Sequence, residues 1–109
     1  MLQLRQPVKV DVRRVVEENY TSPISIEELA YLSGRSLSSF KRDFQSIYGV
    51  SPAKWIREKR LSKARQMLLS SQMSVADVAY SLGFENPTHF SRIFKQQYGA
   101  SPSTFGNRQ

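Results

Sequence analysis

The chain has 109 residues, a formal net charge of +7 at pH 7 and no cysteine. This length suits one domain, or two very small ones that share a core. The lack of cysteine excludes disulfide bonds, thiolate zinc sites and a cysteine nucleophile. The basic excess is consistent with a polyanionic partner. A run of charge by itself more often forms a solvated face, and it is the repeat described below that favours the partner.

No apolar stretch approaches the roughly 18 residues that a membrane span needs. The N-terminal residues lack the apolar core of a signal peptide. We therefore expect a cytoplasmic protein that has no membrane partner. The charge is concentrated in the middle of the chain, since residues 35–71 carry nine basic and two acidic side chains.

One pattern of residues occurs twice, in residues 22–55 and again in residues 71–105. Each copy ends with Tyr-Gly-x-Ser-Pro and an aromatic residue three positions later. The repeat predicts a first subdomain over residues 8–51, a linker helix over 52–71 and a second subdomain over 72–107. Residues 1–7 show no period and are expected to be a linker.

In chain order, valines at helical spacing predict a first helix from Val8 to about Asn19. Ser25 and Glu28 have the spacing of a capping box, which Ser74 repeats with a shorter aspartate partner. Each cap predicts a short helix. Both short helices are expected to end at a glycine in the left-handed conformation, Gly34 and Gly83.

A longer helix follows in each copy, capped by Ser36 in the first and by Asn86, before Pro87, in the second. One face of each helix is predicted to be aromatic and buried, and the other polar and basic. The buried faces consist of Leu37, Phe40, Phe44, Ile47 or Tyr48, and of Pro87, Phe90, Phe94 and Tyr98.

The linker has no internal proline or glycine, which predicts an unbroken helix. Its apolar stripe is formed by Trp55, Ile56, Leu61, Ala64 and Leu68. Arg60 lies on the same side as Ile56 and is expected to make internal hydrogen bonds. We therefore exclude Arg60 from the candidate partner-binding residues.

A short helix, a glycine turn and a longer helix form a helix-turn-helix unit, whose second helix can enter the major groove of DNA. Such a helix needs small residues near its N-terminus and hydrogen-bond donors one turn later. Both copies meet that need. The candidate base-reading residues are Ser38, Lys41, Arg42, Thr88, Ser91 and Arg92.

Residues 34–69 and 76–102 closely resemble the DNA-binding domain of the AraC/XylS family of bacterial transcription regulators. The second half is the more specific, with Ala79, Gly83, Phe84, Phe90, Ser91, Phe94, Lys95, Gly99 and Pro102 at the family's signature spacing. The resemblance implies an all-α fold of about seven helices, in which a long central helix joins two helix-turn-helix subdomains. It also implies that the two recognition helices enter successive major grooves.

The implied function is sequence-specific binding of double-stranded DNA in transcription regulation, as an activator or a repressor associated with the nucleoid. RNA polymerase is the expected second partner. The chain is expected to be either a stand-alone member of the family or the C-terminal part of a longer protein, in which an effector or dimerisation domain precedes it. No cofactor and no metal are expected. Residues expected to contact phosphates or flank the reading positions are Arg35, Ser36, Gln45, Lys54, Arg57, Asn86, Pro87, His89 and Lys95.

Two alternatives stay open at this point. The same fold could serve as a protein-interaction module or as a nonspecific nucleic-acid binder. An enzyme is disfavoured, because the single histidine, His89, has no catalytic partner and no phosphate-binding glycine loop occurs. The aromatic residues could be read as base-stacking groups, but their helical spacing favours a core.

Overall fold

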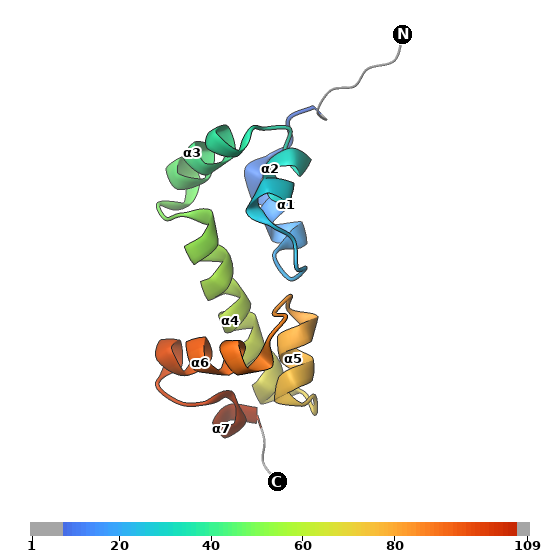
Figure 1. Ribbon diagram of the computed structural model, residues 1–109, viewed down its shortest axis with the longest axis vertical. Helices are drawn as coiled ribbons and strands as arrows, with labels where there is room; N and C mark the ends of the chain where they lie inside the picture. Colours follow the sequence, from blue (N-terminus) through green and yellow to red (C-terminus); the bar gives the residue numbers. More distant parts are fainter. Residues whose placement is uncertain (1–7, 107–109) are drawn as a thin grey trace. The chain divides into compact units, whose positions relative to one another are not determined.

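The computed structural model describes residues 8–106, which form seven α-helices and no β-strand (Figure 1). This confirms the predicted all-α fold of seven helices. Residues 1–7 and residue 107 of the predicted subdivision lie outside the described part of the chain. The helices are α1 (Val12–Asn19), α2 (Ile26–Leu32), α3 (Leu37–Tyr48), α4 (Pro52–Ser70), α5 (Val75–Ser81), α6 (Pro87–Tyr98) and α7 (Pro102–Gly106).

The contacts between residues divide the described chain into two compact units. Unit 1 comprises residues 8–19 and 24–56, and unit 2 comprises residues 20–23 and 57–106. In unit 1, α2 packs against α1 and α3, and in unit 2, α5 and α6 pack against each other and against α7. Within residues 8–106, no helix combines the length and the apolar character that crossing a membrane requires.

Helix α1 ends at Asn19 as expected, but the predicted start at Val8 is wrong, because the helix begins at Val12. The carboxylate of Asp11 accepts a 3.0 Å hydrogen bond from the backbone N–H of Arg13, as an N-cap does. The backbone N–H of Val10 donates to the carbonyl of Ser33, outside any helix. These two bonds fix the helix start one turn later than the valine spacing indicates.

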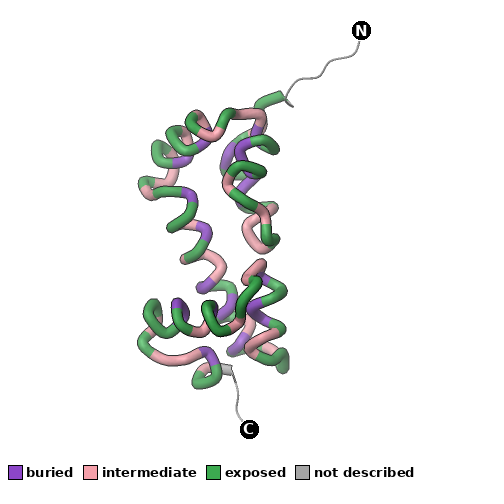
Figure 2. Tube along the Cα trace, in the orientation of Figure 1, coloured by how far each residue is buried: buried purple, intermediate pink, exposed green. Residues whose placement is uncertain are grey.

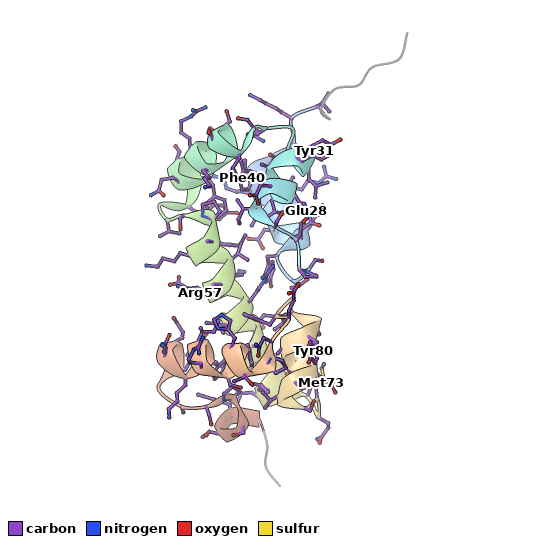
Figure 3. The ribbon with its side chains drawn as sticks, viewed as in Figure 1. Glu28, Tyr31, Phe40, Arg57, Met73 and Tyr80 are labelled. Carbon is purple, nitrogen blue, oxygen red and sulfur yellow. The ribbon has the colours of Figure 1, made fainter. Side chains whose placement is uncertain are left out.

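The core of each unit is aliphatic and aromatic. In α3 and α6 the predicted phenylalanines are fully buried, and buried and exposed positions recur along both helices (Figure 2). Phe40 points from α3 into unit 1 (Figure 3). Buried residues of unit 1 are Val12, Val15, Val16, Leu29, Ala30, Phe40, Phe44 and Ile56, and those of unit 2 are Leu61, Ala64, Leu68, Val78, Ala79, Leu82, Phe90, Ile93 and Phe94.

The predicted ends of α2 and α5 are confirmed. Ser25 and Glu28 form a reciprocal capping box at α2, with hydrogen bonds of 3.0 and 2.8 Å. At α5, the hydroxyl of Ser74 accepts a 3.0 Å bond from the backbone N–H of Asp77. Gly34 and Gly83 have positive φ angles of 75° and 88° where α2 and α5 end.

Residues 20–23 belong to unit 2, where Arg60 and Gly83 hold them. The guanidinium of Arg60 donates to the carbonyl oxygens of Tyr20 and Ser22, which confirms that this arginine is internal. Burial lowers the pKa of the Arg60 guanidinium from its ordinary value. A Cβ atom at position 83 would lie 2.9 Å from the carbonyl carbon and oxygen of Ser22, so only glycine fits there.

Candidate nucleic-acid interface

The polar face of α3 is exposed, whereas its opposite face is part of the core. The hydroxyl of Ser36 accepts a 3.2 Å hydrogen bond from the backbone N–H of Ser39, which satisfies one free donor at the helix start. Four of the predicted contact residues are exposed along the helix: Ser38, Lys41, Arg42 and Gln45.

An aromatic cluster holds α3 against the start of α4. The ring centroids of Phe44 and Tyr48 are 4.3 Å apart, and that of Trp55 lies 4.8 Å from Tyr48 and 5.9 Å from Phe44. Phe40 extends the cluster at 5.9 Å from Phe44. These rings pack against one another within unit 1, so they position α3 and are not available to stack on bases.

Arg42 does not extend freely from α3. Its Nη2 donates a 3.1 Å hydrogen bond to the hydroxyl of Ser39, a half-buried residue one turn earlier on the helix. Because a guanidinium carries five N–H donors, the remaining donors stay available for a ligand. The structure thus presents Arg42 as a donor group with one side tied to its own helix.

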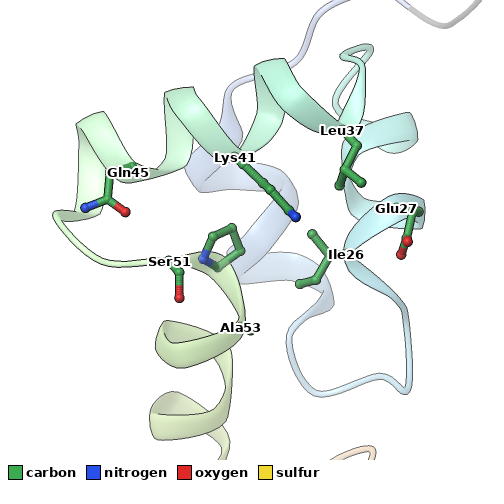
Figure 4. A pocket seen from close by; sticks show the side chains of 8 residues that line it. Ile26, Glu27, Leu37, Lys41, Gln45, Ser51 and Ala53 are labelled. Atoms are coloured by element: carbon green, nitrogen blue, oxygen red, sulfur yellow. The ribbon is translucent and has the colours of Figure 1, made fainter.

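Lys41 has different neighbours. It extends from α3 into a hollow of about 450 Å³ that α2 and the start of α4 complete (Figure 4). Ile26, Leu37 and Pro52 form apolar parts of its lining, and Glu27 is a further lining residue. Lys41 and Arg42 therefore present their charges in different surroundings, although they are adjacent in the sequence.

Helix α6 repeats the arrangement of α3 in unit 2. The side-chain oxygen of Asn86 accepts hydrogen bonds of 2.9 and 3.1 Å from the backbone N–H groups of Thr88 and His89, and Pro87 occupies the first helical position. Among the predicted contact residues, Thr88, His89, Arg92 and Lys95 are exposed, whereas Ser91 is half-buried.

Arg92 is also tied to its own helix, but by a different group. Its Nη2 lies 2.9 Å from Nδ1 of His89, one turn earlier. Because a guanidinium can only donate, this hydrogen bond requires Nδ1 to be the acceptor, in the tautomer that carries its proton on Nε2. His89, for which the sequence indicated no catalytic partner, is therefore a hydrogen-bond acceptor for Arg92, the arginine of α6.

A second aromatic cluster holds α6 in unit 2. The ring of Phe94 lies 5.6 Å from Phe90, 4.8 Å from Tyr98 and 5.4 Å from Phe105, measured between centroids. The guanidinium of Arg65 lies over Tyr98 and Phe105, at 5.4 and 5.7 Å from the ring centroids. Arg65 thus packs within unit 2 as a cation over aromatic rings.

Among the predicted contact residues, Arg35 makes an extensive set of hydrogen bonds within the protein. Its guanidinium donates to the carboxylate of Asp43 and to the carbonyl oxygens of Val10 and Ser33, at 2.8, 2.8 and 3.0 Å. Its side chain is only 13% exposed. Arg35 therefore flanks α3 and fixes its start from inside unit 1.

The remaining predicted phosphate contacts lie on α4. Lys54 and Arg57 are exposed, and Arg57 projects from the helix surface (Figure 3). The hydroxyl of Ser51 accepts a 3.3 Å hydrogen bond from the backbone N–H of Lys54 at the helix start. Among residues 8–106, no group of three or more acidic, histidine or cysteine side chains is arranged to hold a metal ion.

Ser39 was not among the candidate residues predicted from the sequence. A serine among three serines near a helix start carries no distinctive signal by itself. Its position three residues before an arginine is a usable signal, because side chains three and four residues apart meet on a helix surface. His89 and Arg92 have the same spacing.

The family relationship rests on comparisons with known proteins. The model of a family described as a helix-turn-helix domain matches residues 29–108. The virulence regulon transcriptional activator VirF of Yersinia enterocolitica is 35% identical over 92 residues, which are 84% of this chain and 34% of that protein. The chain thus spans about a third of the length of this relative.

Solved structures agree with this relationship. The DNA-binding domain of AdpA, a global transcriptional factor solved in complex with a target DNA, has a TM-score of 0.80 and 30% identity, covering 87% of this chain and 86% of that one. A probable AraC family transcriptional regulator from Rhodopseudomonas palustris has a TM-score of 0.70 and 33% identity, covering 86% and 89%. The chain therefore belongs to the AraC-type family of helix-turn-helix domains, the DNA-binding domains of transcriptional regulators.

Proposed function

We propose that this chain binds double-stranded DNA in a sequence-specific way and regulates transcription, with α3 and α6 as its two recognition helices. The main support for the proposal is that α3 and α6 share the same set of structural features. Each has 12 residues, a capped start, a fully buried pair of phenylalanines and an exposed face that presents an arginine at the sixth position. The AdpA domain, which is similar to this chain, was solved on its target DNA.

The proposed reading of bases follows from the chemistry of the exposed faces. Arginine and lysine suit the O6 and N7 acceptors of guanine, and each good bidentate pair contributes about 1 to 3 kcal/mol of discrimination. Serine and threonine hydroxyls near the helix start allow close approach and accept or donate to either base type. The proposed base-reading residues are Ser38, Lys41 and Arg42 on α3, and Thr88, Ser91 and Arg92 on α6.

Phosphate contacts supply most of the affinity and depend strongly on salt. The net charge of +7 supports a large contribution of phosphate contacts to the affinity. The start of α3 at Ser36 offers backbone N–H groups to phosphates. At the start of α6 the side chain of Asn86 already accepts from Thr88 and His89, so Asn86 is proposed as a flanking residue. Beside them the proposed phosphate or flanking residues are Arg35, Gln45, Lys54, Arg57, Pro87, His89 and Lys95, with Arg35 acting by fixing the start of α3.

The wider role is proposed from the relatives. VirF is named as a transcriptional activator, so we place this chain in an activator that contacts RNA polymerase as well as DNA. The matched residues make up only 34% of this relative, which fits an effector or dimerisation domain elsewhere in a longer protein. A partner of chromosomal DNA implies a cytoplasmic, nucleoid-associated location. The proposal assigns no enzymatic activity.

A salt titration on a selected duplex tests this function. Arg42→Ala should lower the preference for the selected sequence by about five- to a hundredfold, because a base contact is lost. Lys54→Ala should weaken binding to selected and random duplexes alike, and reduce the slope of log K against log salt by about 1.

Equal losses on selected and random duplexes for Arg42→Ala would overturn the reading role of α3. The absence of any preferred sequence for the wild type would favour a protein-interaction or nonspecific nucleic-acid-binding module on the same fold. The Lys54→Ala variant controls for the loss of one positive charge, since both side chains are exposed.

A further inference from the structure

Both recognition helices hold their arginine in the same way. In α3, the arginine at the sixth helical position donates to the side chain at the third position, from Arg42 Nη2 to Ser39 Oγ at 3.1 Å. In α6, the sixth and third positions are again paired, from Arg92 Nη2 to His89 Nδ1 at 2.9 Å. Two helices with different residues at the third position thus arrive at one arrangement.

The two acceptors differ in chemistry but not in role. A serine hydroxyl and a neutral imidazole nitrogen can each accept one N–H bond. Neither bond is required for the fold, because the arginines and His89 are exposed and both helices are already capped by Ser36 and Asn86. The pairing therefore acts on the direction of the guanidinium and not on the packing of the helix.

Direction matters for an arginine that reads a base. Arginine is among the side chains that lose the most rotamer freedom when they are fixed. A bidentate contact with guanine needs two parallel N–H donors in a fixed plane. A side chain that is already held in one orientation on the free protein loses less entropy on binding, which raises affinity for the matching base.

From this we infer that Ser39 and His89 are positioning residues that set base specificity through Arg42 and Arg92, without reading a base themselves. The inference rests on the proposed DNA-binding function. It assigns to Ser39 a role in recognition, and it changes the role of His89 from a phosphate contact to a support for its neighbouring arginine.

A double-mutant cycle tests the inference in α3. Binding of the selected duplex, and of the same duplex with the base pair read by Arg42 exchanged, is measured for four proteins: the wild type, Ser39→Ala, Arg42→Ala and the double variant. Ser39→Ala should lower the preference for the selected base pair by about three- to tenfold, the effect of one hydrogen bond. In the Arg42→Ala background the same substitution should change nothing.

The parallel cycle in α6 uses His89→Ala and Arg92→Ala. His89→Asn serves as the conservative variant, because its side-chain oxygen can accept from Arg92 at the position of Nδ1. In α3, Ser39→Thr is the corresponding conservative variant, because it retains the hydroxyl. Both conservative variants should restore at least half of the lost preference, and helix content and thermal unfolding should match the wild type for all of them.

A loss that persists when the arginine is absent would overturn the inference, because Ser39 or His89 would then contact the DNA directly. A loss that is equal on both duplexes would also overturn it, because the residue would contribute to affinity and not to specificity. Failure of the proposed function is a separate result, since the wild type would then prefer no duplex at all.

Discussion

Nε of Arg35 donates a 2.8 Å hydrogen bond to the carboxylate of Asp43, eight residues later in the chain. The same guanidinium donates from Nη1 to the carbonyl oxygens of Val10 and Ser33. One side chain thus joins the segment before α1, the end of α2 and the middle of α3 within unit 1. Arg35 stabilises the unit that presents Arg42.

Arg35→Ala should lower the free energy of unfolding by about 2 kcal/mol, because hydrogen bonds to a charged group are lost and two carbonyl oxygens lose a donor. Urea unfolding at pH 7 measures this. Arg14→Ala is the matched control: Arg14 and Glu18 form an ion pair in which both side chains are more than 60% exposed, at 69% and 62%. The control should change stability by less than about 0.5 kcal/mol. Equal effects would show that Arg35 is only a surface charge.

The Asp43 carboxylate gives unit 1 an acid-sensitive contact. The hydrogen bond from Arg35 lowers the pKa of Asp43 below its ordinary value. A lowered pKa in the folded state stabilises the fold above the unfolded-state pKa of about 4, and this stabilisation is lost as the pH falls through the folded-state value. Asp43→Asn should therefore flatten the fall in stability below about pH 4. An unchanged acid limb in urea unfolding would contradict the pairing.

Gly83 should tolerate substitution less than Gly99 does. Both have positive φ, 88° and 79°, so alanine is strained by about 1 kcal/mol at either position. At position 83 the added Cβ would also lie 2.9 Å from the backbone of Ser22, whereas at position 99 it meets nothing within 4 Å. Gly83→Ala should cost about 3 kcal/mol in total, including overpacking. Similar midpoints of urea unfolding for the two variants would contradict the close packing of residues 20–23.

Tyr48 carries a hydroxyl that is buried and has no hydrogen-bond partner in the structure. Removing it in Tyr48→Phe should raise the free energy of unfolding by up to about 1 kcal/mol. Burial raises the pKa of Tyr48 in the folded state. The folded protein therefore loses stability as the pH rises through this value, and Tyr48→Phe, which cannot ionise, should resist alkaline unfolding better. Tyr80→Phe, at a side chain that is 56% exposed, is the control. A destabilised Tyr48→Phe would show that the hydroxyl has a partner.

The features predicted from the sequence are local in the chain. The capping box of Ser25 and Glu28 and the caps Ser36 and Asn86 depend on residues within three positions of each other, so the pattern alone indicates them. The aromatic faces of α3 and α6 follow from helical spacing in the same way. Local signals thus defined the helices and the faces on which the candidate site lies.

The features that the sequence did not predict depend on residues far apart in the chain or on side-chain conformation. The hydrogen bonds by which Arg35 fixes the start of α3 could not be predicted, because nothing in its neighbourhood in the sequence reveals the carbonyl of Val10, 25 residues away. The start of α1 was misplaced because the valine spacing extends back to Val8, whereas Asp11 caps the helix three residues later. The bonds from Arg42 to Ser39 and from Arg92 to His89 depend on side-chain rotamers, which spacing permits but does not specify.

Selection from a library of random duplexes tests the central claim most directly. We predict that the wild type enriches a site with two short boxes, that Arg42→Ala relaxes the base preference in one box, and that Arg92→Ala relaxes it in the other. Enrichment of no sequence, or relaxation of the same positions by both variants, would contradict the claim that α3 and α6 each read DNA.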